Sequence, residues 1–344
     1  MLRDRIISRI EGEGPLRVRD FLEMALHDPR EGYYAKGAAI GAEGDFYTAS
    51  NVSLFPGALA RFVKAAMERL EGARLVELGG GTGALAAALQ VPVTAVEPNA
   101  GMAERQRAQG LHVVASLEEL RPAPTVFLAN EVLDALPVHR LLGTPEGVRE
   151  GYLDAVDGAL VEVPGPLSTP ELVNAAARLA PHLPPGAAVE VNLDAAALLS
   201  QMARAAPRGY ALFLDYGGAP ERLYGEGRPG GMLRGFRRHQ VTEPFEAPGE
   251  QDVTADVDFP WIAQLAAEAG WHGHAFAPQG EFLGDLGLVD DLMHALARGD
   301  HAAYLAGKGL LMPGGMGDRF GALLLARDAP MAPPLPGFHP RPHA

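Results

Sequence analysis

The sequence predicts an α/β fold built around a mainly parallel sheet. From about residue 73, short apolar runs alternate with helical segments, a pattern typical of buried strands joined by helices. Strands that follow one another through helices in this way form a parallel sheet with right-handed crossovers. The predicted strands are "ARLVELG", "VTAVEP", "LHVVAS", "TVFLANE" and, later, "YALFLDYG" at 210–217.

The segments before this sheet predict a helical N-terminal lobe. Residues 1–30 indicate two helices, because "RVRDFLEMALHD" has its apolar residues at helical spacing and Pro29 ends the run. Residues 31–56 combine many glycines with aromatic residues, which favours an ordered loop over a flexible linker. A further helix is expected at about 56–71.

The later part of the chain predicts inserted structure and a tail. "VHRLLGT" and "GVREGYLDAV" are expected to pair as antiparallel strands, and a Gly/Pro-rich stretch follows residue 217. The Pro-rich end, "APMAPPLPGFHPRPHA", is expected to be disordered. Helices are expected near 170–181, at 258–269 and within 281–307, and a last strand near 320–327.

Composition excludes several classes of site. The 344 residues carry a formal net charge of −14, so the chain as a whole does not attract phosphate backbones and nucleic-acid binding is not expected. The absence of cysteine excludes disulfides, thiolate nucleophiles and cysteine zinc sites. One local basic cluster remains, with a solvated loop as the simpler interpretation: Arg228, Arg234, Arg237 and Arg238.

The sequence also bears on location. No apolar run approaches the roughly 18–20 residues that a membrane helix needs, so membrane insertion is not expected. The N-terminus, "MLRDRIISRIEGEGPLRVRDF", mixes acidic with basic residues and has neither a secretory apolar core nor the acid-poor pattern of a transit peptide. A cytoplasmic protein is the resulting prediction.

A glycine-rich turn follows the first predicted strand, in "LVELGGGTGALAAAL" at 75–89. Backbone N–H groups in such a strand–helix turn can approach a ligand closely. Glu77 precedes Gly79 by two residues, and Glu97 ends the next strand, where an acid can accept hydrogen bonds from ribose hydroxyls. The dinucleotide fingerprint G-x-G-x-x-G would need glycine where Ala84 stands. The turn instead resembles the first motif, E-x-G-x-G-x-G, of class I S-adenosylmethionine (SAM) methyltransferases, which places Gly81 and Gly83 with Gly79 at the cofactor.

Further motifs resemble one family, the MidA/NDUFAF7-type SAM-dependent methyltransferases, over about residues 15–325. They occur in the family's order, and those outside the glycine turn are specific. The stretches that carry the resemblance are "DPREGYY", "GDFYTASNVSLFPG", "LVELGGGTG", "VEP", "NEVLDALPV", "FLDYG", "DVTADVDF" and "PQGEFLGDLGL". The chain departs from the family pattern at Asn51, where a glutamate is usual, at Asp256, where a histidine is usual, and at Gly321, where a lysine is common.

The segment "NEVLDALP" supplies the predicted acceptor site, because open α/β sheets bind ligands beyond the carboxyl ends of their strands. Carboxylates hold an arginine guanidinium through paired hydrogen bonds, which makes Glu131 the first candidate for orienting an acceptor. Asp134, three residues on, is the second catalytic candidate, and a helix cap is its structural alternative. Asn130 is expected to contact the amino-acid end of SAM.

Other candidates are distributed along the chain. The resemblance implies that "EGDFYTAS" folds over the cofactor, with a purely structural loop as the alternative. Thr48, Ser116 and Leu117 complete the cofactor-binding candidates. No metal site is expected, because His272 and His274 lack an evident third ligand. The substrate-binding candidates are Asp45, Asn51, Glu190, Asp215, Tyr216 and His239.

The resemblance therefore implies a class I SAM-methyltransferase fold: a Rossmann-like sheet with a helical N-terminal lobe and an inserted α+β substrate region. The expected regions are an N-terminal lobe with a cofactor-covering loop (1–71), the methyltransferase domain (72–327) and the tail (328–344). Insertions are expected at about 138–208, 217–256 and 278–320.

The resemblance also implies a function. The cofactor is SAM, and the expected acceptor is an arginine of a protein substrate, with a respiratory-complex subunit as a candidate by analogy. Two alternatives stay open: a small-molecule methyltransferase, and a non-catalytic SAM-binding assembly factor, which the amide at Asn51 keeps open. The sequence does not indicate the oligomeric state.

Overall fold

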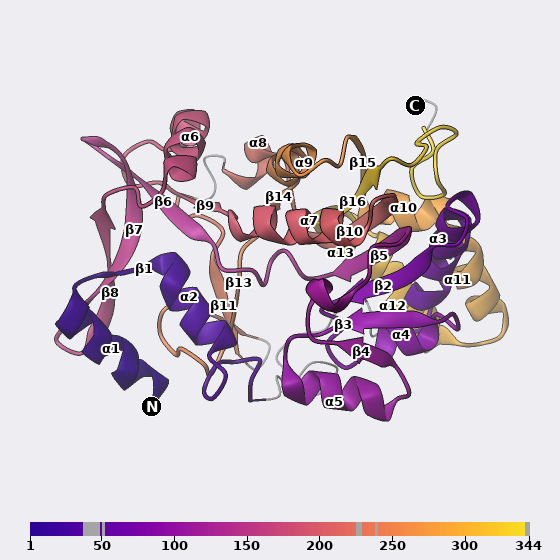
Figure 1. The fold of residues 1–344 in the computed structure, drawn as a ribbon, viewed down its shortest axis with the longest axis horizontal. Coiled ribbons are helices and arrows are strands. Elements are labelled where there is room, and N and C mark those ends of the chain that lie inside the picture. The colour runs from indigo at the N-terminus through magenta and orange to yellow at the C-terminus, as the bar shows by residue number, and fades with distance from the viewer. Residues whose placement is uncertain (37–48, 50–51, 225–228, 238–239, 341–344) are drawn as a thin grey trace.

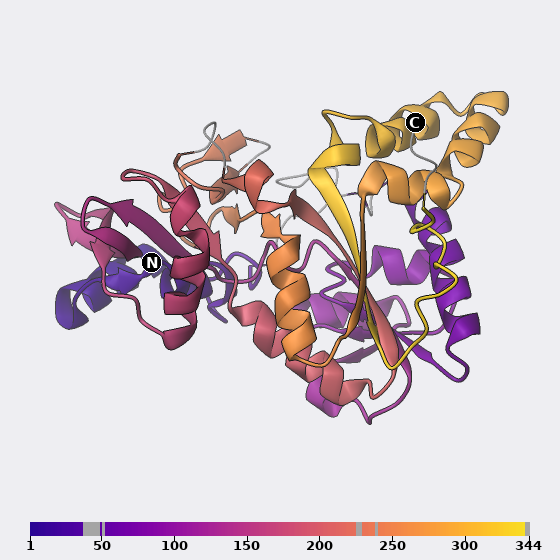
Figure 2. The ribbon, with the colours of Figure 1, turned by 90° about the horizontal axis from the view of Figure 1, so that it is seen from above.

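The computed structural model describes residues 1–36, 49, 52–224, 229–237 and 240–340. Two lobes lie side by side (Figure 1): a large sheet with its helices, and a smaller lobe that contains the N-terminus. Seen from above, helices cover both faces of the large sheet (Figure 2). Within the described residues, no helix has both the length and the apolar character needed to cross a membrane.

The large sheet has the strand order β15-β16-β10-β5-β2-β3-β4, with the short β14 paired to β10. Strands β4 to β10 along this order run parallel, whereas β16 is antiparallel to both of its neighbours. The predicted parallel sheet is thus confirmed, with one antiparallel strand near its edge. The strands are β2 (Arg74–Leu78), β3 (Val93–Val96), β4 (His112–Val114), β5 (Thr125–Asn130), β10 (Gly209–Gly218), β14 (Val257–Asp258), β15 (Gly273–Pro278) and β16 (Phe320–Arg327).

Side chains alternate between the two faces of this sheet, and each face has its own core. On one face, residues such as Phe127 and Phe213 pack with α7 and α9. On the other face, Val126 and Leu212 pack with α3, α4 and α10. The helices are α3 (Phe55–Arg69), α4 (Ala84–Ala88), α5 (Ala100–Ala108), α7 (Asp194–Ala205), α8 (Pro220–Leu223), α9 (Phe259–Glu268), α10 (Gln279–Asp285), α11 (Leu288–Ala297), α12 (His301–Leu311) and α13 (Met316–Arg319), with a 3₁₀ turn at Leu117–Glu119.

The smaller lobe combines the N-terminal helices with the segment inserted after β5. Its antiparallel sheet has the order β1-β7-β6-β9, with β8 on the far side of β7. The predicted pairing of "VHRLLGT" with "GVREGYLDAV" is confirmed, because β6 and β7 pair antiparallel. The lobe contains α1 (Leu2–Glu13), β1 (Leu16–Arg17), α2 (Val18–His27), β6 (His139–Thr144), β7 (Gly147–Val156), β8 (Ala159–Gly165), α6 (Pro170–Leu179), a 3₁₀ turn at Ala180–His182 and β9 (Ala188–Val191).

A third, three-stranded sheet comes from the Gly/Pro-rich stretch after β10. It has the order β12-β11-β13 and consists of β11 (Arg234–Arg237), β12 (Gln240–Thr242) and β13 (Asp252–Thr254). All of its pairings are antiparallel. Asp252, at the start of β13, is buried.

The C-terminal segment corrects one expectation. Disorder was expected there from its proline content, yet the described part of the tail packs against the large lobe. Leu335 is buried, and the ring of Phe338 lies 5.2 Å from that of Phe282 and 6.3 Å from that of Phe62. The Gly337 N–H also donates to Asp285. The prediction of disorder is therefore wrong for this part, because its few apolar residues find partners in a core.

Candidate functional site

The predicted site residues converge on one edge of the large sheet. Strands β2, β3, β5 and β10 run parallel, so their carboxyl ends meet at the same edge. Chain order reverses between β2 and β5, since β3 and β4 lie on one side of β2 and β5 lies on the other. Ligands of open α/β sheets bind at such a reversal.

The glycine turn after β2 adopts a conformation that glycine favours. Gly79, Gly81 and Gly83 have φ angles of 58°, 53° and 82°. Gly79 also donates to the carbonyl of Val96, which fixes the turn against the end of β3. A Cβ atom at Gly80 would lie 2.4 Å from Glu77 Oε2. The turn and the carboxylate beneath it therefore fit only while these positions have no side chain.

Glu77 has an unsatisfied oxygen beneath this turn. Its side chain is buried, one oxygen accepts from the Ala86 N–H, and Oε2 has no hydrogen-bond partner among the described residues. Burial, and then the charge of Glu97, raises its pKa to about 7. An orphaned buried acceptor fits a ligand that brings a positive charge or an N–H, as the amino-acid end of SAM does.

Glu97, in contrast, is held in place by the chain. Its Oε1 accepts from the Asn99 N–H at 2.9 Å, and its Oε2 accepts from Gln106 Nε2 at 3.3 Å. Gln106 also donates to the Gly81 carbonyl at 2.8 Å, which ties the second acid to the glycine turn. Burial raises the pKa of Glu97 despite these donors. Asn99 and Gln106 were not predicted, although Asn99 directly follows the "VEP" motif.

The remaining described cofactor candidates lie at neighbouring strand ends. Ser116 follows β4 and caps the 3₁₀ turn, whereas the Leu117 side chain is buried in the core. Only the backbone of Leu117 is thus available to a ligand. Asn130 ends β5 and donates to Glu131 Oε1 at 3.0 Å, and its own Oδ1 has no partner within the described chain.

Asp215, at the end of β10, organises the turn that contains the two catalytic candidates. Its Oδ2 accepts from the successive N–H groups of Val132, Leu133 and Asp134 at 3.1, 2.8 and 3.4 Å. Its Oδ1 accepts from the Tyr216 N–H. Both oxygens of this substrate-binding candidate are therefore engaged by the protein backbone, and its geometry is that of a positioning group. Burial, followed by the charge of Glu131, raises its pKa to about 7.

Glu131 has a strained backbone at this turn. Its φ of 55° is unusual for a residue with a side chain, and its N–H donates to the Leu214 carbonyl at 2.8 Å. The carboxylate accepts from the Ala49 N–H as well as from Asn130. Burial, and then the charge of Asp134, raises the pKa of Glu131 to about 8. The chain therefore fixes both the backbone and the carboxylate of this residue.

Asp134 lies beside Glu131 in a cluster of acids. It is 5% exposed, and its Oδ1 has no hydrogen-bond partner among the described residues. Burial, then the charges of Asp215 and Asp252, raises its pKa well above the usual range. We name Glu131, Asp134, Asp215 and Asp252 the acidic cluster. The cap role considered for Asp134 does not arise, since "ALPV" forms no helix.

Two residues at the acidic cluster, Asp252 and Tyr34, were not predicted as site residues. Asp252 comes from the third sheet, and its Oδ1 accepts from the Tyr34 hydroxyl at 3.0 Å. Both residues lie in stretches that carry the family resemblance, "DVTADVDF" and "DPREGYY", which was the available signal. Tyr216 also borders the cluster, because burial and then the charges of Glu131 and Asp134 raise its pKa.

Glu190 lies on β9 of the smaller antiparallel sheet, not at the end of a parallel strand. Its Oε1 pairs with Arg140, and its Oε2 accepts from the Met232 N–H at 2.7 Å. Both of its oxygens thus have partners within the protein. The other substrate and cofactor candidates, Asp45, Thr48, Asn51 and His239, lie outside the described residues.

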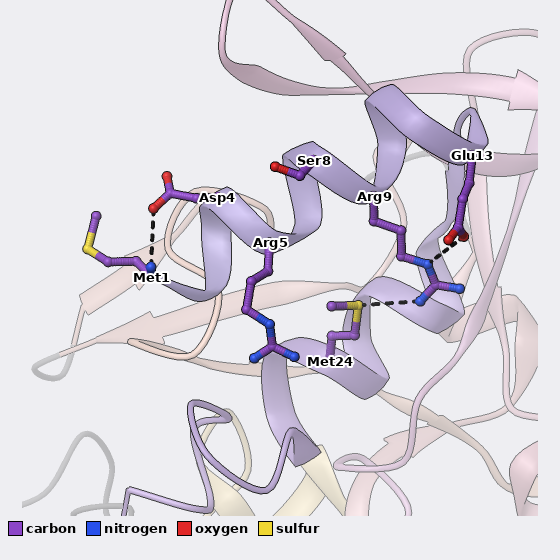
Figure 3. Close-up of a pocket in the computed structure, with 7 residues that line it drawn as sticks. All are labelled: Met1, Asp4, Arg5, Ser8, Arg9, Glu13 and Met24. Atoms are coloured by element: carbon purple, nitrogen blue, oxygen red, sulfur yellow. Dashed lines mark hydrogen bonds and ion pairs between the residues drawn. The ribbon is translucent and has the colours of Figure 1, made fainter.

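An open hollow on the smaller lobe lies apart from these residues. Figure 3 shows that it runs along α1, where Met1 pairs with Asp4 and Arg9 with Glu13. Its charged side chains largely satisfy one another, and it contains none of the predicted site residues. Across the part of the chain that the structure describes, no group of three or more His, Cys, Asp or Glu side chains could hold a metal ion.

Known proteins resemble the chain over nearly its whole length. A likely methyltransferase from Burkholderia thailandensis, with S-adenosyl-homocysteine bound in its crystal structure, is 29% identical. It superimposes with a TM-score of 0.87 over 98% of this chain and 94% of that one. The mitochondrial protein arginine methyltransferase NDUFAF7 of Xenopus tropicalis is 27% identical over 98% of this chain and 89% of its own. The human protein of that name is 28% identical, over 93% and 82%.

These relatives correct the expected location. The N-terminal composition predicted a cytoplasmic protein, but the frog, mouse and human relatives are named as mitochondrial. The cytoplasmic prediction conflicts with that finding and is wrong. The composition of the first 21 residues did not indicate the location that these names give.

The family model that matches residues 58–277 covers the glycine turn, the acidic turn after β5 and the third sheet. It describes putative S-adenosyl-L-methionine-dependent methyltransferases. Together with a class I sheet order and an orphaned acid beneath the glycine turn, the match identifies the fold, the cofactor and the class of reaction. The chain belongs to this family of SAM-dependent methyltransferases.

Proposed function

We propose that this methyltransferase acts on arginine side chains of a protein substrate, with Glu131 and Asp134 at the acceptor. The observation that carries the proposal is the acidic cluster. Asp134, Asp215 and Asp252 are buried, and Glu131 is partly buried. The charges of neighbouring members raise the pKa of Glu131, Asp134 and Asp215, and Asp134 Oδ1 has no partner among the described residues. Such a site favours a cation that brings several N–H donors.

A guanidinium suits this cluster better than an ammonium. Its planar fork donates paired hydrogen bonds to carboxylates, and it is less strongly hydrated than a lysine head group. Glu131 and Asp134 are three residues apart on one turn, so they can approach the same guanidinium from neighbouring directions. The names of the vertebrate relatives support the same acceptor, since those proteins are called protein arginine methyltransferases.

The other half of the site would hold the cofactor. In this proposal Glu77 Oε2 receives the amino-acid end, Glu97 the ribose hydroxyls, and the glycine turn lets the backbone approach the ligand. Asn130 Oδ1, also without a partner among the described residues, lies between the two halves at the end of β5. Ser116 and the backbone of Leu117 would border the far end.

SAM supplies a methyl group that is already activated on its sulfonium sulfur, so the protein mainly has to position the acceptor. Glu131 would orient one guanidinium nitrogen toward the methyl group, while Asp134 accepts from another N–H. The nitrogen would form its bond to the methyl carbon as the carbon–sulfur bond breaks, with S-adenosyl-homocysteine as the leaving group, and its proton would pass to solvent. Because Asp215 fixes three N–H groups of this turn, the two acids keep their directions during the reaction.

The test measures the transfer of a labelled methyl group from SAM to proteins in a lysate of the host lacking this gene. Acid hydrolysis of the labelled protein should release methylarginine, and the Glu131→Gln variant should leave the band unlabelled. Label confined to small molecules would replace the proposal with a small-molecule methyltransferase. No transfer by a protein that still binds S-adenosyl-homocysteine would favour a non-catalytic assembly factor.

The identity of the protein substrate is a finer proposal. The family resemblance suggests a subunit of a respiratory complex, and the labelled band would identify it by mass spectrometry. A labelled protein of any other kind would remove this part of the proposal and leave arginine methylation intact.

A further inference from the structure

Tyr34 lies where three parts of the chain meet that are far apart in the sequence. Its hydroxyl donates to Asp252 of the third sheet, 218 residues away. Its carbonyl accepts from Asn99 Nδ2 at 2.9 Å, on the loop after β3. Its ring stacks on His27, with 5.5 Å between centroids, and His27 in turn contacts the Ala135 carbonyl at 3.3 Å. One residue thus touches both halves of the site, the acceptor half with its side chain and the cofactor half with its backbone.

The "DPREGYY" segment explains how Tyr34 reaches this place. Asp28 Oδ1 accepts from the N–H groups of Arg30 and Glu31, which closes a tight turn after α2. A Cβ atom at Gly32 would lie 2.6 Å from the Asp28 nitrogen, so the turn closes only around glycine. Tyr34 then donates from its backbone to the Leu26 carbonyl. The turn therefore directs the tyrosine ring back toward the acidic cluster.

The hydroxyl of Tyr34 orients a carboxylate close to the catalytic candidates, because the Ala255 N–H, three residues after Asp252, donates to the Asp134 carbonyl at 3.3 Å. Asp252 Oδ1 accepts from Tyr34 and from the Val253 N–H, each at 3.0 Å. The charge of Asp252 raises the pKa of both Glu131 and Asp134, which places it within electrostatic reach of each. Burial, then the charges of Asp252 and Asp134, raises the pKa of Tyr34, so the hydroxyl stays a donor at neutral pH.

We propose that Tyr34 is a positioning residue for methyl transfer, which holds Asp252 as a third carboxylate against the acceptor guanidinium. The proposal rests on the proposed arginine acceptor. Asp134 supports it independently, because its Oδ1, which has no partner among the described residues, marks the interior of the cluster as a place for a donor group. The Tyr34 carbonyl accepts from Asn99, and the Asn99 N–H donates to Glu97. These two hydrogen bonds hold Tyr34, and through it the Asp252 carboxylate, in a fixed position relative to the cofactor half.

The experiment is a double-mutant cycle on the full-length protein. Tyr34→Phe removes the hydroxyl but keeps the ring and the carbonyl that Asn99 binds. Asp252→Ala removes the carboxylate, and Asp252→Asn replaces it in the cycle if the alanine variant no longer binds S-adenosyl-homocysteine. Tyr152→Phe is the matched control, because it removes a tyrosine hydroxyl that donates to the Pro166 carbonyl in the smaller lobe.

Two quantities are measured for each variant. Calorimetry gives the affinity for S-adenosyl-homocysteine. The initial rate of labelled methylarginine formation, at limiting amounts of lysate protein from the host lacking this gene, is proportional to kcat/KM for the acceptor. A merely structural role for Tyr34 would alter both quantities together.

Tyr34→Phe should lower the initial rate roughly ten- to a hundredfold, the range for a hydrogen bond to a charged group, with cofactor affinity nearly unchanged. In the Asp252→Ala background the same change should have little further effect, because Tyr34 acts through that carboxylate. The inference would be overturned if the rate losses of the two single variants multiplied in the double variant. It would also be overturned if Tyr34→Phe lost cofactor affinity in parallel with rate. Methylarginine formation by Tyr34→Phe at the rate of the unmodified enzyme would overturn it too, while leaving the proposed function intact. No methylarginine from the unmodified enzyme would remove both.

Discussion

The cofactor half and the acceptor half of the site are built from the same kind of residue in opposite ways. Glu77 and Glu97 are 20 residues apart, and their partners come from the glycine turn and the helices that follow it. The acidic cluster instead gathers carboxylates from the turn after β5, from β10 and from the third sheet, and their charges raise the pKa of Glu131, Asp134 and Asp215. One half is assembled locally, whereas the other exists only after the whole chain has folded.

This difference teaches what each half can do before a ligand arrives. In the cofactor half, Glu97 has donors for both of its oxygens, whereas Glu77 Oε2 has no partner within the described part of the chain. In the acceptor half, like charges are crowded together, so the site is at its most favourable only when a cation enters. The acceptor half should therefore depend strongly on charge and pH, whereas in the cofactor half this dependence rests on Glu77, whose pKa is about 7.

The largest effect is expected from Glu131→Gln. The change keeps the shape of the side chain but removes the charge that orients the acceptor, and methyl transfer should fall about a hundred- to a thousandfold. The affinity for S-adenosyl-homocysteine should stay within about twofold, as calorimetry would establish. The exposed Glu146→Gln is the matched control and should leave both quantities unchanged. A parallel loss of cofactor affinity in Glu131→Gln would erase the proposed division between the halves.

Glu77→Gln should produce the opposite pattern. An amide in place of the buried carboxylate loses a charge-assisted contact with the cofactor, which should raise the Kd for SAM by about ten- to a hundredfold. At saturating SAM the rate should recover to near that of the unmodified enzyme. Glu71→Gln, on the exposed loop before β2, controls for the substitution itself. A rate that stays low at saturating SAM would show that Glu77 also serves the acceptor half.

The pH dependence separates the halves further. Glu131 has a pKa of about 8, and it must be ionised to hold a guanidinium. At limiting acceptor and saturating SAM, the rate should therefore rise about tenfold per unit as pH increases from 6 toward 8. A flat profile for the unmodified enzyme over this range would contradict the assigned role.

Stability should respond to pH with the opposite sign. The pKa values of Glu131 and Asp215, about 8 and 7 in the folded protein, lie above the ordinary values of 4.5 and 3.8 for these side chains. The folded state therefore binds these protons more tightly than the unfolded chain, and the free energy of unfolding should fall as pH rises from about 5 to 8. Denaturant titrations at several pH values would measure this free energy, which should fall less steeply with pH in Glu131→Gln than in the unmodified protein. The same pH dependence in both proteins would argue against the raised pKa of Glu131.

The smallest effect is expected at Asn99, which joins the halves. Asn99→Ser keeps a cap for the Met102 N–H but loses the donor to the Tyr34 carbonyl. Loss of one neutral hydrogen bond should lower the initial rate about two- to tenfold, with a smaller change in cofactor affinity. Steady-state assays beside calorimetry would measure both. A change confined to cofactor affinity would mean that the link to Tyr34 does not transmit position to the acceptor half.

The sequence predicted the locally determined parts of this molecule. Alternation of apolar runs located the parallel strands, and the spacing of Glu77, Gly79 and Glu97 located the glycine turn, because strand period and turn chemistry act over a few residues. It also located Glu131 and Asp134 at a strand end, since the carboxyl ends of parallel strands meet at one edge.

What could not be predicted depends on contacts across the chain. Tyr34 and Asp252 meet only because the turn after α2 and the third sheet converge on the acidic cluster. For Asp215, strand position was predictable, but the capture of its oxygens by three N–H groups depends on the backbone path after β5. In the tail, proline content predicted disorder, although Leu335 and Phe338 find partners in a core.

A crystal structure with S-adenosyl-homocysteine and an arginine-containing peptide would test the central claim most directly. The sulfur should face Glu131 and Asp134, and the guanidinium should donate hydrogen bonds to those two carboxylates, with Asp252 beside them. A guanidinium bound elsewhere, or a sulfur that points away from the acidic cluster, would contradict the division of the site into a cofactor half and an acceptor half.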